Sequence, residues 1–176
     1  MEALKAVRYF LFLQDKLTKS IEKSDKIKQN ESVTHLKMQK LLYYAQGLSL
    51  VYNTKPLFKE KIEAWEHGPV VREVYEKLKQ YKKDDLSKIS ELVCIDDSLS
   101  EEEKSVIEMA FIEYGRFTAT YLRNKTHEEP TWKEAWSKGK NTIITHESMR
   151  DYFKKEQRLK AEILYLKSKD FRWLFN

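Results

Sequence analysis

The chain has 176 residues, of which 41% are hydrophobic, 12% aromatic and 35% charged. This length can bury a sizeable core in one domain, and the aromatic content excludes an intrinsically disordered protein. The single cysteine excludes an internal disulfide and any multi-cysteine zinc or iron–sulfur centre. Because Gly (4) and Pro (3) are too few for a turn-rich sandwich, we expect a mainly α, compact helical domain with a few short strands or extended segments.

The net charge of +5 is unevenly divided along the chain. Residues 1–90 hold 18 Lys/Arg and 12 Asp/Glu, whereas residues 91–176 hold 15 and 16. A basic half could attract an acidic partner or nucleic acid, but its lysines and acids interleave, so a solvated surface explains it more simply. Apolar runs are too short for a membrane span, and the N-terminus has no signal-peptide cleavage site, so we expect a cytoplasmic protein.

The first third of the sequence predicts two helices. Apolar residues at helical spacing predict a core-docked helix over 3–17, and the polar residues 18–33 predict a loop, with or without a short helical turn. Thr34 is placed to cap a second helix. The broad apolar face of residues 36–51 predicts that this helix is buried and central, and Asn53 follows its end.

The middle of the chain predicts a break, a short helix and then a well-capped one. Residues 57–65 predict one or two short strands or an irregular packed loop. Pro69 is placed in the first turn of a helix that reaches Tyr81. Ser100 and Glu103 form a capping-box pattern, which predicts the start of another helix.

The second half predicts three further helical segments. The helix after the capping box ends near Gly115, and the next one reaches about Asn124. Residues 126–130 predict a loop whose final proline opens a short helix. Residues 141–144 are expected to be extended, and Thr145 is placed to cap a long last helix.

Catalytic and metal-binding patterns are absent from the sequence. There is no Gly-x-Ser-x-Gly elbow and no glycine-rich phosphate loop. Cys94 lies in a Leu-Val-Cys-Ile run, which is typical of a buried, inert thiol. The four histidines are far apart and form no pair on one helix face. We therefore expect no enzyme, no metal site and no cofactor.

Several short motifs follow one another along the chain in a recognisable order. They are Lys37-Met-Gln-Lys-Leu-Leu-Tyr-Tyr-Ala-Gln-Gly47, Lys55-Pro-Leu-Phe58, Ile62-Glu-Ala-Trp65, Gly68-Pro-Val-Val71, Tyr114-Gly115, and Thr126-His127-Glu128 with Pro130 and Trp132. Together they closely resemble the Panacea antitoxin domain, the family of GepA-like phage-associated proteins and SocA-like antitoxins. The resemblance covers roughly residues 4–153, and it departs from the family pattern where Thr131 separates the proline from the tryptophan. We expect a Panacea-like domain over 1–153 and a C-terminal helical extension over 154–176.

The resemblance implies a mostly helical, non-catalytic domain that neutralises a neighbouring toxin by direct protein–protein binding. At least one relative acts as an adaptor, so delivery of the toxin to a AAA+ protease is an alternative. A DNA-binding autorepressor is a further alternative, for which the basic first half is the only sign. Nucleic acid and membrane are not the partners that we expect.

Most motif residues are explained by core packing, with Gly47 allowing a close helix crossing. Its polar and aromatic members are the candidates for contact with the partner, although Gln46 could equally cap a neighbouring element. We predict partner contacts at Tyr43, Gln46, Trp65, His67, His127 and Trp132. The apolar end of the chain either packs back on the domain or forms a second contact surface, through Phe171, Trp173 and Phe175.

Overall fold

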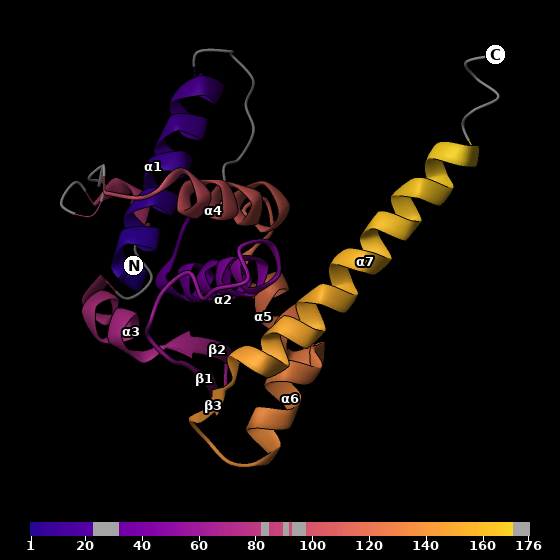
Figure 1. Cartoon of the computed structure of the whole chain (residues 1–176). Coiled ribbons are helices and arrows are strands. Elements are labelled where there is room, and N and C mark those ends of the chain that lie inside the picture. Colours follow the sequence, from indigo (N-terminus) through magenta and orange to yellow (C-terminus); the bar gives the residue numbers. More distant parts are fainter. Residues whose placement is uncertain (23–31, 82–84, 90–91, 93–97, 171–176) are drawn as a thin grey trace.

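The computed structural model describes residues 1–22, 32–81, 85–89, 92 and 98–170, with side chains as far as residue 161. In chain order, the elements are α1 Ala3–Glu22, α2 His35–Tyr52, β1 Ile62–Trp65, β2 Gly68–Val71, α3 Arg72–Leu78, η1 Lys79–Tyr81, η2 Leu86–Lys88, α4 Glu101–Tyr114, α5 Ala119–Glu128, α6 Pro130–Ser137, β3 Thr142–Ile144 and α7 His146–Asp170. Helices dominate and enclose one core, with a small sheet at one end (Figure 1). The predicted mainly α fold is confirmed.

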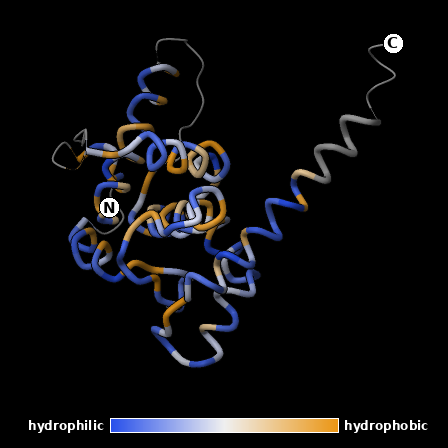
Figure 2. Tube along the Cα trace, in the orientation of Figure 1, coloured by the Kyte–Doolittle hydropathy of each residue, from blue (hydrophilic) through white to orange (hydrophobic). Residues whose placement is uncertain are grey.

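Helix α2 is the centre of the fold. Its residues from Lys37 to Leu50 are all buried, because α4, α5, α7 and β2 pack around it. The Thr34 side chain accepts a hydrogen bond from the Lys37 backbone N–H, as a helix N-cap does. Both the predicted cap and the predicted central position are confirmed. In Figure 2 this helix carries much of the apolar colour inside the molecule.

The crossing of α2 and α7 depends on a glycine. A Cβ built on Gly47 would overlap the Phe153 ring, so the missing side chain lets the aromatic ring lie directly on the α2 backbone. Phe153 is only 1% exposed and also meets Tyr43 and Tyr44 edge to face, with ring centroids 5.5 and 6.1 Å apart. The predicted close helix crossing at Gly47 is therefore confirmed.

Helix α1 is longer than the sequence pattern indicated. It extends to Glu22, so the prediction of a loop from residue 18 is wrong for its first five residues. The Thr18 hydroxyl donates to the Gln14 carbonyl at 2.9 Å, and Lys19 pairs with Asp15 at 2.7 Å. These i,i+4 contacts support helical turns that carry no core side chains. Residues 23–31 of the predicted loop lie outside the described residues, and residues 32 and 33 are irregular, as predicted.

The sheet is built from three short antiparallel strands in the order β2-β1-β3. Pro69 lies in β2 opposite Ala64, so the prediction that it opens a helix is wrong, and α3 begins at Arg72. A proline is tolerated there because β2 is an edge strand. Gly68 has a φ of 95°, in the left-handed region that favours glycine, and this conformation turns the chain into β2.

The helices of the second half follow their caps. The capping box of Ser100 and Glu103 is confirmed in both directions, and α4 ends at Gly115 as predicted. Helix α5 continues to Glu128, so the prediction of a loop over 126–130 is wrong for its first three residues. The helix ends at Glu128 because Pro130 disfavours helical geometry in Glu129, the residue that precedes it.

The last helices also begin where the sequence placed them. Pro130 opens α6, residues 142–144 form β3, and the Thr145 hydroxyl accepts from the Ser148 backbone N–H at 3.2 Å. Helix α7 runs unbroken through residue 153, and its C-terminal part extends away from the rest of the fold (Figure 1). Among the described residues, no helix has the length and apolarity that crossing a membrane requires.

Candidate partner-binding site

A buried carboxyl group joins three helices beneath the candidate site. Glu129, between α5 and α6, is 3% exposed and accepts hydrogen bonds from the hydroxyls of Tyr43 at 2.7 Å and Tyr44 at 2.9 Å. Lys125 forms an ion pair with it at 3.5 Å. The Tyr43 hydroxyl also lies 2.6 Å from that of Thr131 at the start of α6. Glu129 therefore ties α2 to the junction of α5 and α6.

Burial sets the protonation of this cluster. Removal from water raises the pKa of Glu129, although hydrogen bonds from Tyr43 and Tyr44 oppose that shift. Burial also raises the pKa of both tyrosines, and the Glu129 carboxyl adds to the effect. Both hydroxyls therefore stay protonated as donors over the physiological range. The cluster is suited to holding the frame rather than to proton transfer.

Lys40 is another buried ionisable group, one helical turn before Tyr43 and Tyr44 on α2. It is fully buried, and its Nζ donates to the Pro69 carbonyl at 3.0 Å. A Cβ built on Gly68 would lie 2.8 Å from Nζ and 2.7 Å from the Thr126 hydroxyl, so this turn packs directly against the amine. Burial, with Arg123 adding to it, lowers the pKa of Lys40 to about 7.

The lowered pKa of Lys40 predicts a pH-dependent stability. Between about pH 7 and the ordinary lysine pKa near 10.4, the unfolded chain binds a proton at Lys40 that the folded chain does not, so the free energy of unfolding rises with pH. Compared with Lys40→Met, the wild type should gain up to about 1.4 kcal/mol per pH unit across this window. Urea unfolding of both proteins at pH 7, 8 and 9 measures the difference. If the free energy of unfolding changes with pH equally in the wild type and in Lys40→Met, the lowered pKa of Lys40 is contradicted.

Gln46 braces the connection from α2 to the sheet. Its Oε1 accepts the backbone N–H groups of Leu57 at 2.9 Å and Phe58 at 3.1 Å, while its Nε2 donates to the Phe58 carbonyl at 3.1 Å. The same Nε2 lies 3.0 Å from Nε2 of His146. The sequence left a contact role and a capping role open for Gln46, and the structure shows the second.

We predict a large effect for Gln46→Leu. The substitution leaves the Leu57 and Phe58 amides buried without an acceptor, and each buried unpaired group costs about 1–3 kcal/mol. The free energy of unfolding should fall by about 2–4 kcal/mol in urea titration. Gln80→Leu on the exposed η1 is the matched control and should change it by less than about 0.5 kcal/mol.

The predicted contact residues divide into a buried and a surface set. Tyr43 and Gln46 are both 0% exposed, so the folded domain does not present them to a partner. Trp65 and His127 are partly exposed, and His67 is exposed on the turn between β1 and β2. Trp132 is 8% exposed. The predicted tail residues Phe171, Trp173 and Phe175, like Cys94, lie outside the described residues.

The structure brings the surface set together around the hairpin. Trp132 on α6 donates its Nε1–H to the Trp65 carbonyl at 3.0 Å, and its ring stacks on His127 with centroids 4.1 Å apart. Arg72 lies over the Trp65 ring at 5.1 Å and forms a two-point ion pair with Glu63. We define Trp65, His67, His127 and Trp132 as the hairpin face.

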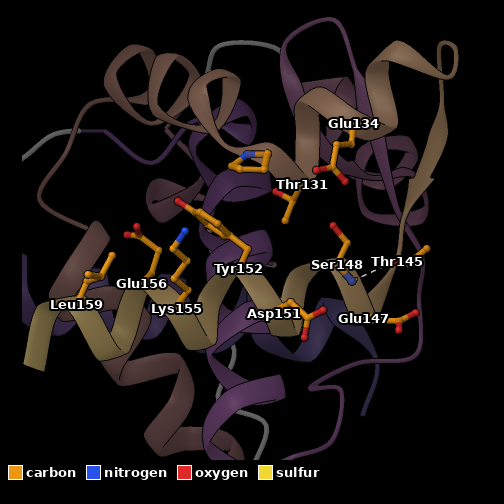
Figure 3. Close-up of a pocket in the computed structure, with 11 residues that line it drawn as sticks. Thr131, Glu134, Thr145, Glu147, Ser148, Asp151, Tyr152, Lys155, Glu156 and Leu159 are labelled. Atoms are coloured by element: carbon orange, nitrogen blue, oxygen red, sulfur yellow. Dashed lines mark hydrogen bonds between the residues drawn. The ribbon is translucent and has the colours of Figure 1, made fainter.

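A cleft between α6 and α7 is a feature that the sequence reasoning missed. It has a volume of about 630 Å³. Figure 3 shows Thr131 and Glu134 of α6 on one side and Ser148, Tyr152 and Glu156 of α7 on the other. Burial and the nearby Glu129 carboxyl raise the pKa of Tyr152, so this residue connects the cleft to the buried cluster. Four carboxylates and one lysine line the cleft.

Sequence alone offered only a partial signal for the cleft. Glu147 and Asp151 are four residues apart and therefore share one face of α7. Glu134 belongs to a different helix, and only the turn through β3 brings that helix beside α7. Among the residues that the structure describes, no group of three His, Cys, Asp or Glu side chains is arranged to hold a metal ion.

A comparison with known proteins identifies the family of this chain. The family described as Antitoxin SocA-like, Panacea domain, matches residues 38–133, more than half of the chain. No curated protein and no solved structure gives a significant match. The matched region contains Lys40, Gln46 and Glu129, the residues around which the buried part of the site is built. The chain therefore belongs to the SocA-like Panacea antitoxin domain family.

Proposed function

We propose that this protein is an antitoxin that neutralises a toxin protein by binding it directly. The family match over residues 38–133 is the observation that carries this proposal. An antitoxin-like role is the property that the family name states, whereas the identity of the partner and the mode of neutralisation are our inference. A non-catalytic module is consistent with the buried Lys40 and Glu129, because both are bonded to other groups of the protein.

A protein-binding role also agrees with the separation of buried motif residues, which hold the fold together, from surface residues that a partner can reach. The buried motif residues hold α2, the hairpin and α6 in one frame. The α6–α7 cleft is open at the surface of this frame, and so are His67 and, in part, Trp65 and His127 of the hairpin face, whereas Trp132 on α6 is 8% exposed. A stable frame with accessible aromatic and charged groups supports recognition of another protein. We propose that toxin contacts come from the surface residues rather than from Tyr43 and Gln46.

Growth rescue tests the proposal. Each open reading frame beside the gene is induced alone and then together with this protein. We expect one neighbour to arrest growth, this protein to restore it, and the two proteins to co-purify. Rescue with loss of the neighbour from the cell, prevented by inactivating AAA+ proteases, would instead favour the adaptor mechanism. If no neighbour is toxic, the antitoxin proposal fails.

The apolar end of the chain gives a further prediction. Deleting residues 168–176 should weaken protection against the toxin without unfolding the domain, if Phe171, Trp173 and Phe175 form a contact surface. Growth rescue measures protection, and thermal unfolding by circular dichroism checks that the domain is intact. Unchanged protection by the shortened chain would refute this second contact surface.

A further inference from the structure

The α6–α7 cleft has a charge opposite to that of the rest of the protein. Glu134, Glu147, Asp151 and Glu156 line it with a single cation, Lys155, which gives a local charge of −3. The remainder of the chain contains 32 Lys/Arg and 24 Asp/Glu, a charge of +8. A positively charged segment is therefore attracted to this cleft, whereas the net charge of the remainder of the chain opposes it.

The carboxylates of the cleft are also unpaired. Within the described part of the chain, the carboxylates of Glu134, Glu147, Asp151 and Glu156 form no ion pair and accept no hydrogen bond. Several carboxylates elsewhere are paired, for example Glu63 with Arg72 at 2.6 Å and Glu102 with Lys55 at 2.8 Å. The dipole at the α7 N-terminus accounts for Glu147 in the first turn, but not for Glu134 on α6 or Glu156 farther along α7.

The walls of the cleft are held in place from below. Thr131 is 2% exposed, and its hydroxyl meets Tyr43, which donates to the buried Glu129. On the opposite wall Tyr152 is half-buried and packs edge to face on Phe153, with centroids 5.3 Å apart. A preformed cleft loses little conformational entropy when it is filled. Its volume of about 630 Å³ lies in the range of binding sites that take a compact ligand or side chains of a docked segment.

We propose that this cleft docks a Lys/Arg-bearing segment of the toxin, an inference that rests on the proposed function. The unpaired carboxylates receive the cationic side chains, and the Ser148 hydroxyl offers a further acceptor. Leu159, 44% exposed at the edge of the cleft, receives an apolar residue of the same segment. The same negative charge repels a phosphate backbone, so nucleic acid does not fit this site.

A peptide titration tests the cleft without knowledge of the toxin. The probe is a synthetic helical peptide of arginine, alanine and leucine, and its control has every arginine replaced by glutamine. The full-length protein is titrated with each peptide, and changes in its backbone amide NMR chemical shifts are measured. We expect the arginine peptide, and not its control, to shift amides of α6 and the first half of α7. High salt should weaken this binding. In Glu134→Gln, Asp151→Asn, Glu156→Gln the affinity should fall by about tenfold. Binding elsewhere, or equal binding by this variant, overturns the proposal.

Two matched variants test the cleft by growth rescue in cells. The cleft variant is Glu134→Lys, Asp151→Lys, Glu156→Lys, and the control carries Glu2→Lys, Glu73→Lys, Glu128→Lys at exposed positions. Both should unfold at the wild-type temperature, because none of the six side chains is buried. We expect only the cleft variant to lose growth rescue.

The outcomes separate the two proposals. If the wild type and the cleft variant rescue growth equally, the cleft proposal is overturned and the antitoxin role stands. If the wild type rescues growth from no neighbour, the antitoxin role fails. The peptide titration then decides whether the cleft binds basic segments at all.

Discussion

Replacing Glu129 with leucine is expected to lower the free energy of unfolding by about 3–5 kcal/mol. The substitution removes the acceptor of both the Tyr43 and the Tyr44 hydroxyl, and these groups are buried where water cannot replace it. It also leaves Lys125 without its partner on this helix turn. Urea unfolding followed by circular dichroism measures the loss, and toxin rescue should fall with it, because the start of α6 is positioned by this cluster.

The neighbouring residue provides a matched control for Glu129. Glu128→Leu makes the same chemical change one position earlier, at an exposed site, and should alter stability by less than about 0.5 kcal/mol. The loss of stability in Glu129→Gln should lie between those of Glu129→Leu and Glu128→Leu, since an amide oxygen can still accept a hydrogen bond from one tyrosine. If Glu129→Leu and Glu128→Leu are equally stable, the Glu129 cluster does not hold the frame together.

A further large effect is expected at Gly47. Alanine is the better helix former by about 1 kcal/mol, so helix propensity alone predicts that Gly47→Ala stabilises α2. Its methyl group would overlap the Phe153 ring, however, and overpacking of a tight contact costs about 1–3 kcal/mol or more. We expect the steric effect to exceed the propensity gain, with a net loss of about 2 kcal/mol in urea unfolding.

A double-mutant cycle identifies the cause at Gly47. Phe153→Leu alone should destabilise the protein through a cavity, because the ring is buried between α2 and α7. In the double variant the smaller side chain makes room for the methyl group, so the combined loss should be at least about 1 kcal/mol less than the sum of the single losses. Strictly additive losses would show that Gly47 matters for a reason other than its contact with Phe153.

Local patterns in the sequence determined where most helices begin. Thr34, Ser100 and Thr145 cap α2, α4 and α7, and Pro130 opens α6, as the sequence predicted. These signals can be read because a cap and its N–H partner lie within one helical turn. The central position of α2 could also be predicted, since a helix that is apolar around most of its circumference has to be buried.

Tertiary structure decided the features that local patterns misassigned. Pro69 satisfies the rule for the first turn of a helix, but pairing with Ala64 and the turn at Gly68 place it in a strand. The loop predicted from residue 18 is helical as far as Glu22, because i,i+4 contacts support turns that lack an apolar stripe. Such contacts are individually weak, so their outcome is not evident from the pattern of residues.

The candidate site shows the same division. The family was evident from the order of short motifs, and the match over residues 38–133 confirmed it. Whether a motif residue faces the core or the surface was not evident, because a polar group such as Gln46 can be buried only when distant amides satisfy it. The cleft required α6 and α7 to be brought together by β3, so its charge was assembled only by the fold. Sequence by itself therefore determined the family and the local helix starts, whereas long-range packing decided which side chains a partner can reach.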